Sequence, residues 1–472
     1  MTQIRRTKIV ATLGPASESP KVIRTLIDAG VDAVRLNFSY GDHETHGRLI
    51  DAVRESAAAA GKDVAILQDL QGPKIRVGDL TGGSVRLHTG AKVRLTSKPI
   101  VGTATRISTT YDHLAQEVDT GDKILLDDGS IELIVDKVSR GEVICAVVRG
   151  GTLKAKKGLN LPGVPIRTSA FTAKDRRDLR FGLERGIDSV ALSFTRSAND
   201  AEPVRRFMRD IGRSVPLLAK IEKPQALRNL DRVLRAFDGV MVARGDLGVE
   251  IGPEKVPAAQ KRIIHRANAL GKPVITATQM LESMTKNARP TQAEASDVAN
   301  AVLDGTDVVM LSGETASGRY PEESVRVMDL IVREAESLVT PAAPQPHTLK
   351  RTSRGHSICH AAVGLANEVG AAAIVTPTRS GRTARILSAL RPGVPIFALC
   401  ERESVARGLS LFRGVNPVSV DKLGNAEDVI VLIQGQLVKR RLVAAGEDVV
   451  VVALGRDGPA RQTNFIRLIR AR

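Results

Sequence analysis

The feature that most constrains the fold is a series of short apolar, β-branched runs that alternate with helical stretches. Near-continuous apolar strands between helices are typical of a parallel sheet that is covered on both faces. Eight such units predict a (β/α)8 barrel. The runs are Lys8–Gly14, Ala33–Ser39, Val64–Leu70, Ser189–Phe194, Leu217–Glu222, Gly239–Gly245, Pro273–Thr278 and Val308–Gly313.

The barrel pattern is interrupted once, between the third and fourth runs. There the chain holds short alternating strands, such as Val85–Leu87, Lys92–Leu95 and Ile131–Val135, with Gly- and Asp-rich turns between them. We therefore expect a small β-barrel domain inserted into a loop of the larger barrel.

A third region follows the eighth run. Residues Val339–Arg354 are rich in Pro and Thr and are typical of a connector. Helix-like stretches then alternate with four more apolar runs, which indicates a separate α/β domain. The sequence thus predicts a barrel domain (1–72 and 167–340), an inserted lid domain (73–166) and a C-terminal α/β regulatory domain (341–472). The four runs are Ala372–Thr376, Pro395–Cys400, Val415–Val420 and Asp448–Gly455.

Composition narrows the function classes. No apolar run approaches the ~20 residues of a membrane span, and the basic start of the chain lacks the apolar stretch of a signal peptide. The three cysteines are widely spaced, which excludes a disulfide framework and a CxxC metal site. We expect a cytoplasmic protein with no membrane partner.

The formal net charge of +17 suggests nucleic-acid binding as one interpretation. The basic residues are spread along the chain, however, and aromatics make up only 3%, with no Trp. Stacking platforms for single strands are therefore scarce, and no nucleic-acid partner is expected. Anionic small molecules account for part of the charge.

Polar residues cluster where the predicted barrel strands end, which is where the active sites of such barrels lie. Each has a structural alternative: Arg35 could pair with Asp69, Lys220 with Glu222, and Thr278 could cap a strand end. The strand-end residues are Arg35, Asn37, Ser39, Asp69, Lys220, Glu222, Asp246, Thr278, Ser312 and Glu314.

Taken together, these residues indicate phosphoryl-transfer chemistry. Lys220 follows three apolar residues, where a buried ammonium is costly without a partner. Glu222 and Asp246 end adjacent strands and supply the hard oxygen ligands that suit Mg²⁺. Cations beside a Mg²⁺ site serve phosphoryl transfer, whose catalysis is mostly positioning and charge neutralisation. The segment from Gly245 adds small residues and a helix start whose backbone N–H groups could bind a carboxylate.

Six segments resemble the motifs of pyruvate kinases and occur in the family's order. The resemblance covers about residues 4–467 and implies a Mg²⁺-dependent enzyme that transfers the phosphoryl group of phosphoenolpyruvate to ADP, giving ATP and pyruvate. The segments are Arg6–Ser17, Arg35–Ser39, Lys220–Glu222, Ala243–Asp246, Ala277–Leu281 and Met310–Thr315.

The resemblance implies a role for each matched position. Lys220 would neutralise the transferring phosphoryl group and the developing enolate, and Arg35 would grip the phosphoryl oxygens. Glu222 and Asp246 would hold the first Mg²⁺, which Mn²⁺ could replace, and a second ion would arrive with ADP. Arg76, in the Gly-Pro-x-Ile-Arg motif, is a further catalytic candidate.

At the other strand ends, Thr278 matches the position linked to protonation of the enolate, with Ser312 and Glu314 nearby. Backbone N–H groups of Gly245 and Asp246 would bind the substrate carboxylate. The inserted domain would close as a lid that excludes water. Family members are usually homotetramers, so we expect a homotetramer here.

Two other functions remain open at this stage. One is a Mg²⁺-dependent aldolase-type barrel acting on pyruvate or phosphoenolpyruvate. The other is a barrel that binds nucleic acid without catalysis.

The sequence departs from the family's K⁺-dependent pattern. Asn37, Ser39 and Asp69 match side-chain ligands of the monovalent-cation site, but Leu70 replaces the usual Thr and Lys74 the usual Glu. The Lys74 ammonium carries the charge of K⁺ and could occupy much the same region, so we expect that K⁺ is not required. The alternative is that Lys74 is a solvated lysine at the lid hinge.

A phosphate-binding loop is predicted in the C-terminal domain. Hydroxyls, Gly and Arg between a strand and a helix N-terminus suit a phosphate and are similar to the family's effector loop. A well-capped turn is the alternative. The tail Gly455–Arg461 departs from the family's pattern, so a phosphorylated activator other than fructose 1,6-bisphosphate is expected, such as a sugar monophosphate, or a nucleotide at another site. The loop residues are Thr378, Arg379, Ser380, Gly381, Arg382 and Thr383.

Overall fold

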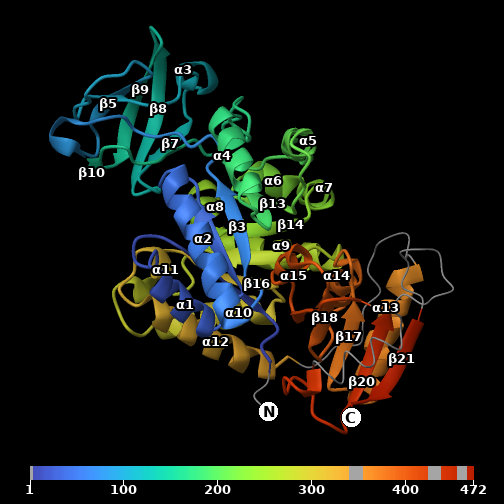
Figure 1. Cartoon of the computed structure of the whole chain (residues 1–472). Coiled ribbons are helices and arrows are strands. Elements are labelled where there is room, and N and C mark those ends of the chain that lie inside the picture. The colour runs from blue at the N-terminus through green and yellow to red at the C-terminus, as the bar shows by residue number, and fades with distance from the viewer. Residues whose placement is uncertain (1–3, 340–353, 424–436, 454–464, 472) are drawn as a thin grey trace.

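The computed structural model describes residues 4–339, 354–423, 437–453 and 465–471. Eight parallel strands close into a barrel in the order β1-β16-β15-β14-β13-β12-β3-β2 (Figure 1). Each lies within one of the eight predicted runs, so the predicted barrel is confirmed. The strands are β1 (Lys8–Thr12), β2 (Ala33–Asn37), β3 (Ala65–Leu70), β12 (Ser189–Leu192), β13 (Leu217–Ile221), β14 (Gly239–Ala243), β15 (Val274–Ala277) and β16 (Val308–Leu311).

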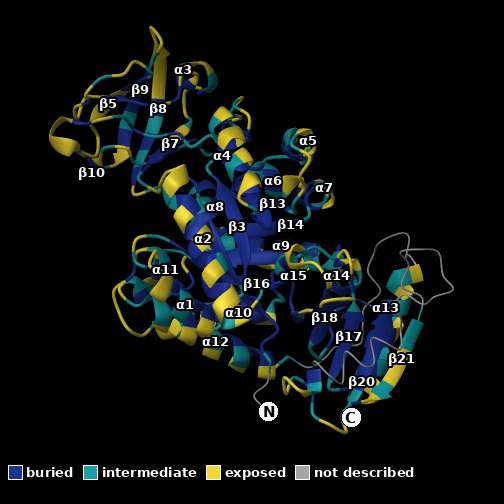
Figure 2. Cartoon of the chain, viewed as in Figure 1, coloured by how far each residue is buried: buried dark blue, intermediate teal, exposed yellow. Residues whose placement is uncertain are grey.

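The alternation of side chains along these strands fills two cores. Residues such as Leu67, Leu218 and Met241 pack inside the barrel, while Ile66 and Val240 pack under the outer helices. Figure 2 shows buried barrel strands and helices whose outward faces are exposed. No helix of the described ranges is long and apolar enough to cross a bilayer. The outer helices are α1 (Pro20–Asp28), α2 (His43–Ala60), α4 (Ala173–Glu184), α5 (Ala201–Asp210), α6 (Pro224–Arg228), α7 (Leu230–Ala236), α9 (Val256–Ala269), α10 (Gln292–Leu303) and α12 (Pro321–Ser337).

The inserted β domain leaves the barrel after β3 and projects from its upper end in Figure 1. Its strands form a six-stranded sheet, β11-β7-β8-β9-β5-β6, and a two-stranded sheet, β10-β4, around one shared core. Its entry and exit strands run side by side, since Arg76 and Gly158 form an antiparallel bridge. The strands are β4 (Ser84–Leu87), β5 (Lys92–Thr96), β6 (Arg106–Ser108), β7 (Lys123–Leu126), β8 (Ile131–Ser139), β9 (Glu142–Arg149), β10 (Gly151–Lys154) and β11 (Leu159–Asn160).

The C-terminal α/β domain is built on a five-stranded sheet, β19-β18-β17-β20-β21. The first four strands in this order are parallel, as predicted, but β21 adds an antiparallel edge strand that we had not predicted. The predicted connector lies largely outside the described residues, as does the tail Gly455–Arg461. The elements are β17 (Ala373–Pro377), β18 (Ile396–Cys400), β19 (Val415–Ser419), β20 (Asp448–Ala453), β21 (Phe465–Arg470), α13 (Arg354–Glu368), α14 (Arg382–Ala389) and α15 (Glu403–Leu409).

The C-terminal domain docks at the amino ends of the barrel strands, through ion pairs to acidic residues that precede them. Arg407 contacts Asp188, before β12, at 3.0 Å, and Arg391 contacts Asp307, before β16, at 2.9 Å. The inserted domain therefore lies at the opposite end of the barrel, where the predicted site residues are.

Candidate active site

A buried lysine contacts two carboxylates at the barrel mouth, one from its own strand end and one from β3, which lies beyond β12. The Lys220 ammonium, at the end of β13, lies 2.8 Å from Glu222 and 3.2 Å from Asp69 of β3. It also donates to the Ser193 hydroxyl, at 2.7 Å, just beyond β12. The predicted Lys220–Glu222 pairing is thus observed, and it is part of a larger network.

Arg35 joins the same network from β2. Its Nε and Nη2 atoms each lie 2.7 Å from Oδ2 of Asp69, and its Nη1 donates to the Thr12 hydroxyl at 3.2 Å. Asp69 is therefore shared by two cations, Arg35 and Lys220. This arrangement holds both cations at one point of the barrel mouth before any anion arrives.

The electrostatics of the network favour the charged forms of Asp69 and Lys220. Burial alone would raise the pKa of Asp69, but Lys220 and Arg35 outweigh it and hold that pKa below its ordinary value. Burial likewise disfavours charge on Lys220, yet Asp69 and Glu222 raise its pKa. A charged Lys220 and Arg35 are ready to meet a phosphate or an enolate.

Glu222 and Asp246 form a pair of carboxylates near this network. Burial, together with the negative charge of Asp246, raises the pKa of Glu222, whose second oxygen accepts a 2.7 Å bond from the Phe194 N–H. Mutual repulsion of two carboxylates is relieved by a cation, and their hard oxygens suit Mg²⁺. Among the described residues no group of three or more His, Cys, Asp or Glu could hold a metal, so such an ion would take its other ligands from water and substrate.

Thr278, just after β15, has a left-handed backbone with φ of 67°, and Gln279 has φ of 54°. A β-branched residue rarely adopts this conformation, so surrounding contacts must hold it. Arg244 supplies them by donating to the Thr278 carbonyl (2.7 and 3.1 Å) and the Gln279 carbonyl (2.9 Å). The Thr278 hydroxyl accepts the Gly245 N–H at 2.9 Å, so it lies beside the amide that we expected to bind a carboxylate.

Glu314 and Ser312 lie beyond β16. The Glu314 carboxylate is fully buried and accepts the N–H groups of Leu281 (2.9 Å) and Ser312 (2.7 Å). Glu314 thereby fixes the loop that follows Thr278. The Ser312 hydroxyl is buried without a hydrogen-bond partner in the described part of the chain, and is free to bind a substrate or a water.

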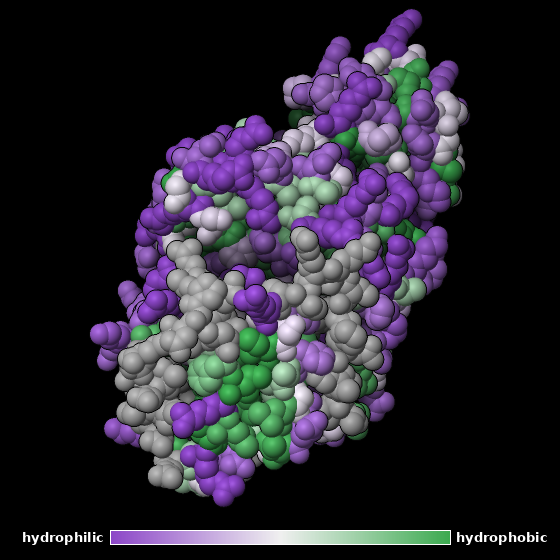
Figure 3. All heavy atoms as spheres, turned by 90° about the vertical axis from the view of Figure 1, so that its right-hand side faces the viewer, coloured by the Kyte–Doolittle hydropathy of each residue, from purple (hydrophilic) through white to green (hydrophobic). Residues whose placement is uncertain are grey.

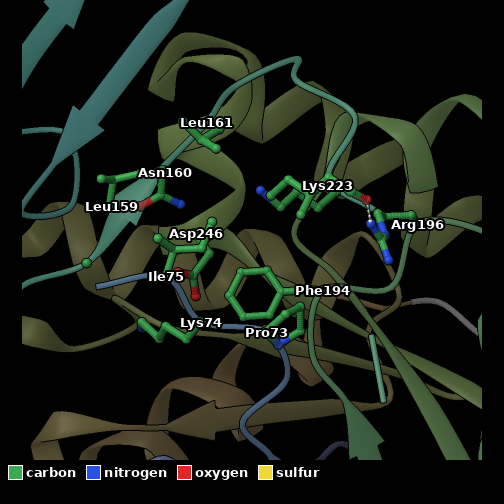
Figure 4. Close-up of a pocket in the computed structure, with 12 residues that line it drawn as sticks. Pro73, Lys74, Ile75, Leu159, Asn160, Leu161, Phe194, Arg196, Lys223 and Asp246 are labelled. Carbon is green, nitrogen blue, oxygen red and sulfur yellow. Dashed lines mark hydrogen bonds between the residues drawn. The ribbon is translucent and has the colours of Figure 1, made fainter. Parts of the chain in front are cut away.

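A pocket lies between this site and the inserted domain and encloses about 460 Å³ of space, part of it open to solvent. Figure 4 shows Asp246 and Phe194 at its centre, Lys74 on one side, and Lys223 and Arg196 on the other. Lys74 has no ion-pair partner in the described residues, whereas Lys223 pairs with Glu250 at 2.7 Å and Arg196 donates to the carbonyls of Ile166 and Thr168. The end of β11 forms the upper wall of the pocket. Such a site suits an anion bound together with a divalent metal ion.

Arg76 lies apart from the Lys220 network. Its guanidinium donates to the Lys156 carbonyl, at 3.1 Å, within the inserted domain. The structure therefore places Arg76 at the base of this domain.

The monovalent-cation candidates come from two neighbouring segments. The Asn37 side chain accepts the Ser39 N–H at 3.1 Å, and Leu70 is completely buried. Lys74 lines the pocket described above and has no ion-pair partner in the described ranges. The contacts of Asp69 are taken by Arg35 and Lys220.

The predicted effector loop connects β17 to α14, as the sequence indicated. The Thr378 hydroxyl accepts the Gly381 N–H at 2.9 Å, and Gly381 has a left-handed backbone that only glycine adopts readily. Arg379, Ser380 and Arg382 are exposed. Thr383 lies in the first turn of α14.

Two important residues were missed from the sequence. Ser193 had only its position after a predicted strand to identify it, and its role appears once its hydroxyl is seen between Lys220 and Asp69, 3.3 Å from the latter. Arg244 lay inside a quoted motif, but its hold on the Thr278 loop depends on contacts between residues 34 positions apart.

Comparison with known proteins agrees with this geometry. The family model "Pyruvate kinase, barrel domain" matches residues 4–325, and "Pyruvate kinase, alpha/beta domain" matches residues 356–469. The chain is 45% identical to a pyruvate kinase of Mycobacterium tuberculosis over 99% of this chain and 98% of that protein. It is 46% identical to one of Corynebacterium glutamicum over 98% and 97%, respectively.

A solved structure of a pyruvate kinase from Cryptosporidium parvum superposes with a TM-score of 0.92 at 37% identity, over 99% of this chain and 96% of that one. The similarity therefore extends over both domain models and nearly the whole chain, and the chain belongs to the pyruvate kinase family.

Proposed function

We propose that the network at the barrel mouth transfers the phosphoryl group of phosphoenolpyruvate to ADP, giving ATP and pyruvate. The observation that carries this proposal is the buried Lys220 held among Asp69, Glu222 and Ser193, with Arg35 on the same carboxylate. Two fixed cations beside a pair of carboxylates supply the charge neutralisation that this reaction needs.

Each residue then has a defined task. Arg35 binds the phosphoryl oxygens in its forked geometry, and Lys220 neutralises charge first on the phosphoryl group and then on the enolate oxygen. The backbone N–H groups of Gly245 and Asp246, in the first turn of α8 (Arg244–Ile251), bind the substrate carboxylate. We assign Arg76 to the phosphates at the lid side of the site.

Thr278 is proposed to direct protonation of the enolate carbon. Its hydroxyl is fixed beside Gly245, and the unpartnered Ser312 hydroxyl is suited to hold the water that relays the proton. Glu314 holds in place the loop that follows Thr278 and the backbone of Ser312. When bound, Mg²⁺ or Mn²⁺ at Glu222 and Asp246 would supply Lewis-acid charge at the oxygens of the substrates.

We propose a division into a barrel of residues 1–72 and 167–340, a lid of residues 73–166 and a regulatory domain of residues 341–472. The separate core of the inserted domain and its narrow connection to the barrel support this division. A lid that swings on this connection would exclude water from the phosphoryl group.

A coupled assay tests the activity. Purified protein with phosphoenolpyruvate, ADP and Mg²⁺ is expected to form ATP and pyruvate in equal amounts, and chelation of divalent ions is expected to stop the reaction. Absence of ATP formation by the folded, metal-supplied protein would contradict the proposal.

We further propose that the enzyme does not require K⁺. The support is Lys74, an ammonium that lies in the pocket with Asp246 and is free of ion pairs in the described residues. Leu70 stands at the position where the family's usual Thr supplies a backbone oxygen, and Asp69 is already shared by two cations. The positive charges of Lys74, Arg35 and Lys220 would repel a further free cation at this position.

Activity in a buffer free of K⁺ and NH₄⁺, with ionic strength held by a tetraalkylammonium salt, tests this idea. We expect full activity without K⁺, and a many-fold drop that K⁺ restores would refute the idea. The matched variant Lys74→Glu should lose activity without K⁺ and regain part of it when K⁺ is added.

We also propose that a phosphorylated activator, such as a sugar monophosphate, binds the loop of residues 378–383. The exposed Arg379, Ser380 and Arg382 beside the N-terminus of α14 support this assignment. Replacing Thr378, Ser380 and Thr383 together by Ala should abolish the effector response. An unchanged response to every sugar phosphate and nucleotide that activates the wild type would contradict the assignment.

Finally, we propose a cytoplasmic homotetramer with no nucleic-acid partner. The support is the similarity to the pyruvate kinase family over nearly the whole chain. Light scattering coupled to size-exclusion chromatography would measure the mass, and four chains per particle is the expected result.

A further inference from the structure

A second anion-binding site is suggested by a hollow on the outer face of the barrel, at the N-terminal parts of α2 and α4. The hollow encloses about 700 Å³, including its open side, and lies between α4, α5 and the start of α2. Its aromatic residues are Phe181 and Phe207, with His43 beside them. Its volume lies within the range of small-molecule sites.

Three arginines of α4 line this hollow: Arg176, Arg177 and Arg180. All are exposed, and none has an ion-pair partner in the described part of the chain. At these spacings, their side chains leave the helix within about 100° of one another. Other exposed arginines in the described ranges, such as Arg86 and Arg94, also lack an ion pair; what distinguishes these three is that they line a single hollow together.

Aromatic rings fix two of these guanidinium groups. Arg176 lies over Phe171, at 4.9 Å from the ring centroid, and over Phe207, at 5.8 Å. Arg180 lies over Phe207 at 5.5 Å. Stacking leaves the N–H edges of a guanidinium free for oxygen acceptors and lowers the entropy lost when they bind.

The acidic residues nearby do not neutralise the three arginines. Asp175 caps α4, and Asp178 is occupied by Lys174 at 2.6 Å and His43 at 2.9 Å. Glu184 is the one acidic residue that lines the hollow, and it forms no ion pair in the described ranges. The side of the molecule that carries α5 and α7 faces the viewer in Figure 3, where hydrophilic residues predominate on the upper part.

We propose that this hollow is a binding site for a compact small molecule that carries two or more phosphate groups. The three guanidinium groups supply paired N–H donors that match phosphate oxygens. An organic phosphoester and an inorganic phosphate chain share this chemistry.

The position of the hollow links it to the active site. The Asp175 carboxylate on α4 accepts the N–H of Gly72, at 3.1 Å, where the chain leaves β3 for the lid. Lys174 donates to the Phe38 carbonyl, at 2.7 Å, between Asn37 and Ser39. A ligand bound to α4 would therefore lie on a helix that directly contacts the segment connecting β3 to the inserted domain.

Isothermal titration calorimetry in Mg²⁺-free buffer tests the proposal, with inorganic tripolyphosphate and inositol hexakisphosphate as separate probes. The variant Arg176→Gln/Arg177→Gln/Arg180→Gln is compared with wild type. Loss of three charge-assisted contacts should lower the affinity of this site for at least one probe by roughly ten-fold or more. The probe that is weakened more identifies the source of the phosphate groups.

The matched control removes the same charge elsewhere, through Arg24→Gln/Arg106→Gln/Arg326→Gln. These surface arginines lie on α1, β6 and α12, away from the hollow. The control should bind both probes as tightly as wild type. Equal affinities in all three proteins, or equal weakening in both variants, would show that no specific site exists.

Hydrogen–deuterium exchange of the wild-type protein provides an independent check that does not depend on how the variants fold. Either probe that binds in the hollow should slow exchange in a peptide covering residues 173–184. Unchanged exchange in that peptide, at probe concentrations that saturate the calorimetric signal, would overturn the proposal.

Discussion

At the scale of single residues, the central fact is that one carboxylate, Asp69, serves two cations. Arg35 and Lys220 come from strands on either side of the site and meet on this group. Their positions are fixed before the substrate binds, so little reorganisation is needed when charge develops. The same buried network also contributes to the stability of the barrel mouth.

Replacing Lys220 by Met should leave a folded protein with little activity, because Asp69 would still have Arg35 as its partner. Loss of a fixed cation at the developing charge typically costs ~3–4 kcal/mol or more, which lowers kcat by roughly two to three orders of magnitude or more. Steady-state kinetics measure the loss, with circular dichroism as the control for folding. Near-normal kcat in a folded variant would refute the role of Lys220.

Asp69→Asn should lower the thermal stability in a pH-dependent way. The pKa of Asp69 is held below its ordinary value, so its charge stabilises the folded protein above the unfolded pKa of about 4. That contribution is lost as pH falls through the lower folded pKa. The gap in Tm between wild type and variant should be constant from about pH 7 to 5 and narrow below about pH 4. A gap that widens on acidification would contradict this assignment.

At the scale of elements, the site depends on how the loop after β15 is held. Arg244 begins α8, grips the carbonyls of Thr278 and Gln279, and is itself anchored by Asp297 of α10 at 2.6 Å. The Arg244 guanidinium thus connects α8 and α10 to the strained backbone of Thr278 and Gln279 and holds that backbone in place.

Arg244→Lys should therefore impair proton transfer more than substrate binding, since an ammonium cannot reproduce the forked contacts. We expect kcat to fall by roughly ten-fold or more through a 1 Å-scale displacement of Thr278. The exchange of solvent deuterium into the methyl group of pyruvate should fall in parallel, while KM for ADP changes little. Undiminished deuterium exchange would show that Arg244 does not position Thr278.

The sequence alone is sufficient to predict strands and helices whose signal lies within one short stretch of consecutive residues. Apolar runs identified all eight barrel strands, and the strand-end rule identified the pairs Arg35–Asp69 and Lys220–Glu222 at the barrel mouth. The edge strand β21 was missed because an arginine follows every two apolar residues in it, a spacing that does not have the period of two of a strand, and because its pairing with β20 is antiparallel. Ser193 and the left-handed Thr278 depend on contacts between distant segments, which periodicity does not report.

At the scale of the whole molecule, the three cysteines are distributed unevenly. Cys145 lies in the core of the lid, and Cys359 and Cys400 lie in the core of the C-terminal domain. The barrel strands and helices contain none. Burial raises the pKa of each thiol to about 12, so all three should be inert at neutral pH while the protein is folded.

Thiol labelling in increasing urea should therefore report the opening of the two outer domains separately. Mass spectrometry of the labelled peptides distinguishes Cys145 from Cys359 and Cys400, and the latter two should become reactive together. The variant Cys145→Ser lacks the only thiol of the inserted domain, so the labelling that it loses is the labelling that comes from that domain. Rapid labelling of any of the three without denaturant would contradict their burial.

The paired entry and exit strands of the lid have a consequence for chain architecture. Because Arg76 and Gly158 are bridge partners, the insertion begins and ends at neighbouring points. The chain that leaves the barrel after β3 therefore returns close to its point of departure. A short turn in place of the insertion would connect β3 directly to α4. In this sense the inserted domain is a removable module, which could be exchanged between related barrels without rebuilding the barrel strands.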